Sequence, residues 1–125
     1  MDVIHTALKV SDLDEARSFF VDGIGLDEQW SFSYDGVTNV YVGGDNGEIQ
    51  LIYDPWVAVP EPDRRTFDHI AISVDDVDGE TERIAGETGC AVLKGPLTID
   101  DAGARVSFIK GPDGYVIELV ESLAD

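Results

Sequence analysis

Apolar and polar positions follow the same order twice along the chain. Residues 5–16, "HTALKVSDLDEA", match residues 69–80, "HIAISVDDVDGE", and residues 41–52 match residues 108–120. Each copy opens with the two-residue alternation of a half-buried strand and continues with the apolar spacing of an amphipathic helix. Agreement at both ends predicts two copies of one structural unit. The identities in the first match are His5/His69, Ala7/Ala71, Val10/Val74, Asp12/Asp76 and Asp14/Asp78.

The first copy predicts a strand over residues 3–10 and then a helix. Ser11 or Asp12 is expected to cap the helix, and Gly23 or Gly25 to end it. Hairpin-forming strands should follow, because alternating segments are separated by turn residues such as the Asp-Gly pair at positions 35 and 36. These strands are expected at residues 26–34, 37–42 and 48–53.

The second copy predicts the same succession. Asp76 should cap a helix over residues 77–88, and Gly89 should end it. The strands are expected at residues 69–74, 90–99, 104–110 and 115–121. We therefore expect an α+β fold in which two tandem βαβββ modules form a single domain. Module 1 covers about residues 3–54, a proline-rich connector residues 55–67, and module 2 about residues 68–121.

Four polar side chains occupy matching positions in the two modules. His5 and His69, the only histidines, open the first strand of each module, and Gln50 and Glu118 lie inside apolar last strands. Strand alternation places them opposite the core-facing residues. An isolated histidine or glutamate on a strand is ordinarily no ligand. If the modules are related by a pseudo-twofold axis, however, these groups converge into a plausible site for Zn, Ni, Co, Fe or Mn.

The charge of the chain disfavours several classes of partner. Twenty-six acidic residues face eight basic ones, so the formal net charge is −18. Such a surface disfavours nucleic acid and anionic membranes. We interpret the excess as adaptation to high salt, a halophilic character, because salt screens self-repulsion.

Segments for membrane insertion or export are not expected. No apolar run approaches the roughly 20 residues that span a bilayer, and the start "MDVIHT" lacks the features of a signal peptide. A single cysteine, Cys90, fits a reducing compartment, and its apolar neighbours favour a packing role over a catalytic one. We expect a cytoplasmic protein.

Several motifs resemble the vicinal oxygen chelate superfamily, which includes glyoxalase I, bleomycin resistance proteins and extradiol dioxygenases. They are "HTALKVSDLDEARSFF", "GIGL", "EIQLIYD", "DHIAISVDD" and "GPDGYVIELVE", and they are most similar to the short bacterial type of glyoxalase I, lactoylglutathione lyase. The resemblance implies paired modules with a curved sheet around one divalent metal ion (Ni, Co, Zn or Mn) in a homodimer. It implies His5, Gln50, His69 and Glu118 as the metal ligands.

The implied reaction converts the hemithioacetal of methylglyoxal and a thiol into an S-lactoyl thioester. Glu118 would be the base, because Gln50 replaces the glutamate that glyoxalase I usually carries there. The resulting ligand set is similar to that of methylmalonyl-CoA epimerase, which is an alternative, as are a thiol transferase and a dioxygenase. A metal-free binding protein is a further alternative. Its cleft walls would be Trp30, Phe32, Tyr41 and Trp56, which otherwise serve as packing residues.

Recognition of the thiol would fall to charged residues near the ligands. Lys9 stands where glyoxalases tend to place an arginine, and Arg65 lies four residues before His69. Asp54, four residues after Gln50, replaces an expected asparagine and would repel a carboxylate unless a cation neutralises it. The alternative is that these charges are solvated. Glutathione and another low-molecular-weight thiol both remain open.

Overall fold

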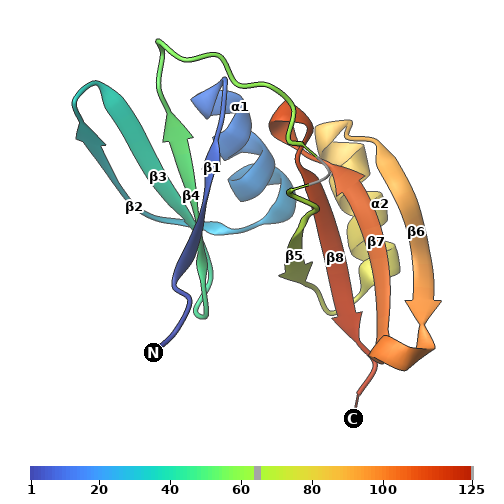
Figure 1. Cartoon of the computed structure of the whole chain (residues 1–125). Helices are drawn as coiled ribbons and strands as arrows, with labels where there is room; N and C mark the ends of the chain where they lie inside the picture. The colour runs from blue at the N-terminus through green and yellow to red at the C-terminus, as the bar shows by residue number, and fades with distance from the viewer. Residues whose placement is uncertain (64–65, 125) are drawn as a thin grey trace. The chain divides into compact units, whose positions relative to one another are not determined.

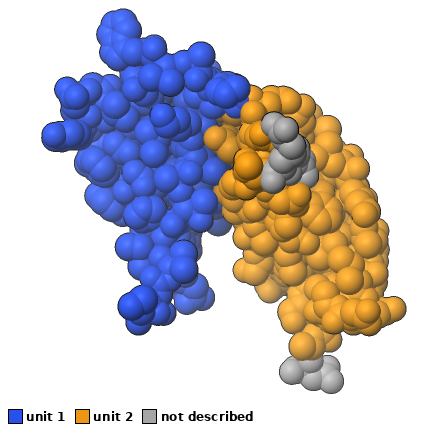
Figure 2. Space-filling model, viewed as in Figure 1, with its two compact units in different colours: residues 1–60 blue, residues 61–125 orange. Residues whose placement is uncertain are grey.

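The computed structural model describes residues 1–63 and 66–124, and the chain divides into two compact units. Unit 1 spans residues 1–60 and unit 2 residues 61–125 (Figure 2). Each unit follows the order βαβββ that the repeat predicts. Unit 1 contains β1 (His5–Lys9), α1 (Leu13–Arg17), β2 (Asp27–Tyr34), β3 (Val37–Gly43) and β4 (Glu48–Tyr53). Unit 2 contains β5 (Ile70–Ser73), α2 (Val77–Thr88), β6 (Val92–Ile99), β7 (Ala104–Lys110) and β8 (Val116–Ser122).

The two sheets have the same topology (Figure 1). Their strand orders are β1-β4-β3-β2 and β5-β8-β7-β6, and in each the first and last strands of the unit pair in parallel while the other pairs are antiparallel. The register also repeats, because Ala7 lies opposite Gln50 and Ala71 opposite Glu118. The predicted α+β fold of two βαβββ modules is confirmed.

The first helix begins as predicted but changes its winding. The Asp12 side chain accepts a hydrogen bond from the Glu15 N–H at 3.0 Å and so caps α1. Residues 18–24 continue α1 as a π-helix, and the N–H of Gly25 bonds to the carbonyl of Phe20, five residues back, at 3.2 Å. Gly25, with φ of 100°, ends the helix, so the later of the two expected glycines is the terminator.

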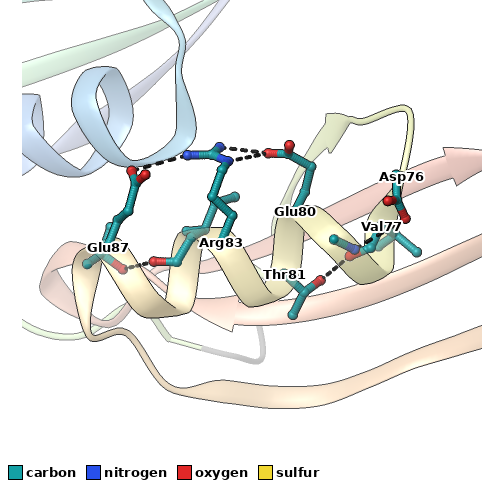
Figure 3. Close-up of polar contacts among 9 residues, drawn as sticks. Asp76, Val77, Glu80, Thr81, Arg83 and Glu87 are labelled. Atoms are coloured by element: carbon teal, nitrogen blue, oxygen red, sulfur yellow. Dashed lines mark hydrogen bonds and ion pairs between the residues drawn. The ribbon is translucent and has the colours of Figure 1, made fainter.

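The second helix has the predicted bounds, Val77–Thr88 (Figure 3). Asp76 caps it by accepting a hydrogen bond from the Gly79 N–H at 3.2 Å. A Cβ at position 79 would lie 2.6 Å from the Asp76 Oδ2, which explains a glycine in the first turn. On the exposed side, Arg83 pairs with Glu80 and Glu87 (Figure 3).

The fully buried strand side chains of each unit lie on one face of its sheet, and this fixes the direction of Gln50 and Glu118. Leu51 on β4 and Leu119 on β8 are fully buried. Because side chains alternate along a strand, Gln50 and Glu118 project from the opposite face. The first strands are shorter than predicted: β1 begins at His5 and β5 directly after His69. None of the helices in the described residues has the length and apolarity to cross a membrane.

Candidate metal centre

In unit 2 two of the predicted ligands face each other. His69 lies at the start of β5, Glu118 lies on the adjacent strand β8, and the His69 Nε2 is 3.1 Å from the Glu118 Oε1. Two ligand atoms bound to one ion at about 2.1 Å lie roughly 3.0 to 3.4 Å apart in octahedral or tetrahedral geometry. The separation therefore fits two donors of one divalent metal. Glu118 is only 15% exposed, so its carboxylate is held largely away from solvent.

The other nitrogen of His69 contacts a carboxylate. The Asp68 Oδ2 lies 2.6 Å from the His69 Nδ1. Metal-binding histidines commonly donate their second N–H to a carboxylate, which fixes the ring and selects the tautomer. A proton on Nδ1 leaves Nε2, the nitrogen that faces Glu118, to bind a metal. Asp68 therefore adds an orienting contact that the sequence alone did not indicate.

In unit 1 the register places His5 and Gln50 as it places His69 and Glu118. Ala7 lies opposite Gln50 on the same strand pair and in the same parallel register as Ala71 opposite Glu118. The Gln50 Nε2 donates a hydrogen bond to the Asn39 Oδ1 at 2.9 Å. The amide nitrogen is thereby engaged, and the carbonyl oxygen Oε1 remains as the atom able to bind a metal.

An aromatic ring supports each histidine in the same way. His5 meets Tyr41 edge-on, with ring centroids 5.5 Å apart and an interplanar angle of 76°. His69 meets Phe108 at 5.7 Å and 84°. Tyr41 lies opposite Gln50, and Phe108 lies opposite Glu118. The repeat therefore extends to the packing around the candidate ligands, a relation that appears only once the strand register is known.

Three of the four aromatic candidates for a binding wall lie together in unit 1. Trp30 stacks on Tyr41 with centroids 4.0 Å apart, and Phe32 lies 5.5 Å from Trp30. Trp30 and Phe32 are 49% and 41% exposed, whereas Tyr41 is buried. Trp56 is 87% exposed and lies in the connector, outside this stack. The ligand-bearing face of this sheet is thus partly aromatic.

The residues predicted to recognise the substrate are only partly brought near the ligands. Lys9 lies on β1, where strand alternation puts it on the same face as His5. Asp54 follows β4, and its Oδ1 accepts a hydrogen bond from the Trp56 N–H at 3.0 Å, which gives this carboxylate a turn-forming role. Arg65 lies outside the described residues.

Lys94 is a cation that the sequence pattern did not single out. It is exposed on β6, and the register puts it opposite Phe108, which lies opposite Glu118. Within residues 1–63 and 66–124 it forms no ion pair. Other cations of this part of the chain pair with carboxylates, namely Arg17, Arg83, Arg105 and Lys110. On a strongly acidic protein, a cation two strands away from Glu118 in the same sheet is a candidate contact for an anionic substrate group.

A separate carboxylate group lies at the start of α2. Atoms of Asp76, Asp78 and Glu121 lie within 4.8 Å of one another. Asp76 caps the helix, Glu121 accepts a hydrogen bond from the Val77 N–H at 2.9 Å, and Asp78 pairs with Arg105 at 2.7 Å. Hydrogen bonds from Arg105 hold the pKa of Asp78 below its ordinary value. These contacts give the cluster a structural role in fixing the start of the helix.

Comparison with known proteins shows the family to which the chain belongs. Residues 3–119 match the model of the Glyoxalase/Bleomycin resistance protein/Dioxygenase superfamily, and the chain belongs to this family. A probable lactoylglutathione lyase of Vibrio cholerae is 30% identical over 96% of this chain and 90% of its own length. The lactoylglutathione lyase of Haemophilus influenzae is 30% identical over 98% of this chain and 93% of its own.

A solved relative has the same fold over nearly the whole chain. The trypanothione-dependent glyoxalase I of Leishmania major superposes with a TM-score of 0.79 at 27% identity, covering 97% of this chain and 86% of its own. The recognition of the family from the sequence is therefore confirmed. The relatives also support the expectation that the chain is an enzyme of the lyase type.

Proposed function

We propose that the protein is a metal-dependent lyase of the glyoxalase I type, and that His5, Gln50, His69 and Glu118 are the ligands of one divalent ion. The observation that supports this proposal most directly is the 3.1 Å separation of the His69 Nε2 and the Glu118 Oε1. The repeated strand register supports an equivalent pair, His5 and Gln50, in unit 1. Two imidazoles, an amide oxygen and a carboxylate suit Ni, Co, Zn or Mn. The family match supports the same assignment.

The reaction is an internal transfer of hydrogen. A divalent ion at this centre supplies electrostatic stabilisation for negative charge that develops on the two vicinal oxygens of the substrate. Glu118 takes a proton from the carbon that bears sulfur, and the electron pair of that C–H bond moves toward the neighbouring carbonyl. The same carboxyl returns the proton to the adjacent carbon. The hydroxyl proton of the sulfur-bearing carbon passes to the oxygen of the adjacent carbon, so the first oxygen becomes the thioester carbonyl and the second becomes the hydroxyl of the lactoyl group. The product is an S-lactoyl thioester with no change in overall composition, so no external oxidant or reductant is needed.

The assignment of the base to Glu118 follows from the donor set. It is the one carboxylate among the four proposed ligands, and an amide such as that of Gln50 cannot accept a proton at neutral pH. Low exposure strengthens the interaction of the carboxylate with a nearby positive charge and limits competition from water. Gln50 therefore contributes to binding the ion, and Glu118 contributes to both binding and proton transfer.

The thiol portion of the substrate carries negative charge in this proposal. Lys94 on unit 2 and Lys9 on unit 1 lie on the strand faces that bear the proposed ligands. A lysine ammonium group that contacts a substrate carboxylate forms a charge-assisted hydrogen bond with it. The relatives named lactoylglutathione lyase favour glutathione, while the Leishmania enzyme is trypanothione-dependent. We propose an anionic low-molecular-weight thiol, and a homodimer as the assembly.

A second candidate is an epimerase on the same scaffold. The feature that favours it is Gln50, because a set of two histidines, one glutamine and one glutamate is similar to the ligand set of methylmalonyl-CoA epimerase. An epimerase would also remove and return a proton beside a carbonyl, with Glu118 as a base. The two activities differ in product, because an epimerase inverts a carbon centre without forming a lactoyl thioester.

The test combines metal analysis with turnover. The purified protein should bind about one divalent ion per chain and form S-lactoyl thioester from methylglyoxal and a thiol. Glu118→Gln should lower kcat by at least about 10²-fold, because it removes the base while preserving shape. Glu82→Gln, an exposed carboxylate on α2, is the matched control and should retain full turnover. Substantial turnover in Glu118→Gln would refute the role of Glu118, and metal binding without thioester formation would favour the epimerase.

A further inference from the structure

Asn39 is a buried polar residue beside a proposed ligand. It lies on β3 and is 6% exposed. Its Nδ2 points to the carbonyl of Val37 at 3.5 Å, and its Oδ1 accepts the hydrogen bond from the Gln50 Nε2 at 2.9 Å. A buried amide left unsatisfied costs about 1 to 3 kcal/mol, so these contacts favour one orientation of the Asn39 amide.

The orientation of Asn39 determines the orientation of Gln50. An acceptor oxygen at Asn39 binds the nitrogen end of the Gln50 amide and repels the oxygen end. The Gln50 Oε1 is therefore directed away from Asn39. This matters for an amide ligand, because only its oxygen binds a divalent ion, whereas either oxygen of a carboxylate can do so.

Unit 2 provides an internal comparison. In unit 1, Tyr41 lies opposite Gln50, and Asn39 is two residues before Tyr41. In unit 2, Phe108 lies opposite Glu118, and the residue two before Phe108 is Val106, which is 2% exposed. The unit with an amide ligand thus has a buried hydrogen-bond acceptor at this register position, and the unit with a carboxylate ligand has an apolar side chain there.

We propose that Asn39 is a positioning residue that holds the Gln50 amide with its Oε1 available to the metal, and that it is the structural reason the centre accepts glutamine in place of glutamate. The proposal rests on the proposed function, because it takes Gln50 as a ligand. Asn39 acts through Gln50 and has no direct role in the proton transfer.

A double-mutant cycle in metal affinity tests the proposal. Asn39→Val copies the residue of unit 2 and removes the acceptor; Gln50→Glu replaces the amide by a carboxylate. The Kd for Co²⁺ or Zn²⁺ is measured by competition with a chromophoric chelator. Asn39→Val should weaken metal binding about 10- to 100-fold in the protein with Gln50, the usual range for residues that orient a ligand. In the Gln50→Glu background the same substitution should change the Kd less than about twofold, because either carboxylate oxygen can bind the ion.

Two further variants separate positioning from a general loss of structure. Ser107→Ala removes another fully buried hydrogen bond, the 2.6 Å contact with Thr81, at a distance from Gln50 along the chain and in the other unit. It should lower the unfolding temperature of the metal-free protein without changing the Kd. Should Asn39→Val fail to fold, Asn39→Ser keeps a polar side chain that is too short to reach Gln50, and it should show the same dependence on residue 50.

The outcomes distinguish this inference from the proposed function. Equal effects of Asn39→Val in the protein with Gln50 and in the Gln50→Glu variant, or no effect in either, would overturn the role of Asn39 while the metal centre stands. A Kd that does not respond to Glu118→Gln would overturn the metal centre itself, and with it the inference. A loss confined to the background with Gln50 supports both.

Discussion

Asp68→Ala tests whether the carboxylate at the His69 Nδ1 orients the proposed ligand. The 2.6 Å contact is a short charge-assisted hydrogen bond, of a kind that contributes about 1.5 to 3 kcal/mol when it is well shielded. The Asp68 side chain is 69% exposed, so solvent screening reduces this contribution. We expect about 1 to 1.5 kcal/mol, which corresponds to about a tenfold weaker metal affinity.

The assay is the same chelator competition, with a control for net charge. Asp75→Ala removes one exposed carboxylate from the same unit without removing a contact of His69, and it should change the Kd less than about twofold, because screened surface charges interact weakly. Asp68→Asn keeps an oxygen acceptor and should lie between the wild type and Asp68→Ala. If Asp68→Ala and Asp75→Ala have the same Kd, the contact contributes only charge, and the reasoning about orientation is refuted.

The remaining predictions concern stability. Ile84→Ala deletes a fully buried side chain on α2 and should lower the free energy of unfolding by about 2 to 4 kcal/mol in denaturant titrations; a loss below about 1 kcal/mol would contradict the assigned core. Because the net charge is −18, the unfolding temperature should rise from dilute buffer to molar salt, and equal stability in both would contradict adaptation to salt. Arg105 lowers the pKa of Asp78, so their pairing stabilises the folded state above the ordinary aspartate pKa and is lost as the pH falls through the lowered value. Asp78→Asn should remove that part of the acid dependence in unfolding measured against pH; an unchanged profile would show that the pair does not contribute.

The helices and turns were predictable because their signals are local. Asp76 and Gly89 bound α2 where capping preferences place them. The turn at Asp35 and Gly36 has positive φ at both residues, as an Asp-Gly hairpin requires. The π-helical winding after α1 was not predictable, since its apolar spacing satisfies an α-helix equally well. The start of β1 was placed too early because pairing with β4 begins only at His5, which apolar character alone does not reveal.

Only those residues of the candidate site that occupy matching positions in the two repeats could be predicted from the sequence. His5 and His69 stand out as scarce residues at equivalent positions, and alternation puts Gln50 and Glu118 off the core face. The supporting residues did not stand out, because their roles depend on which residues lie opposite each other across strands. Asn39 is an ordinary polar residue in an alternating segment until β3 is aligned with β4.

The central claim is that one centre both binds the divalent ion and carries out the reaction. The most direct test strips the protein of metal, confirms by circular dichroism that it remains folded, and follows S-lactoyl thioester formation from methylglyoxal and an anionic thiol as Ni, Co, Zn or Mn is added back. The account predicts negligible turnover without metal and recovery that saturates at about one ion per chain. Full turnover by the metal-free protein, or saturable metal binding without thioester from any thiol, would contradict it.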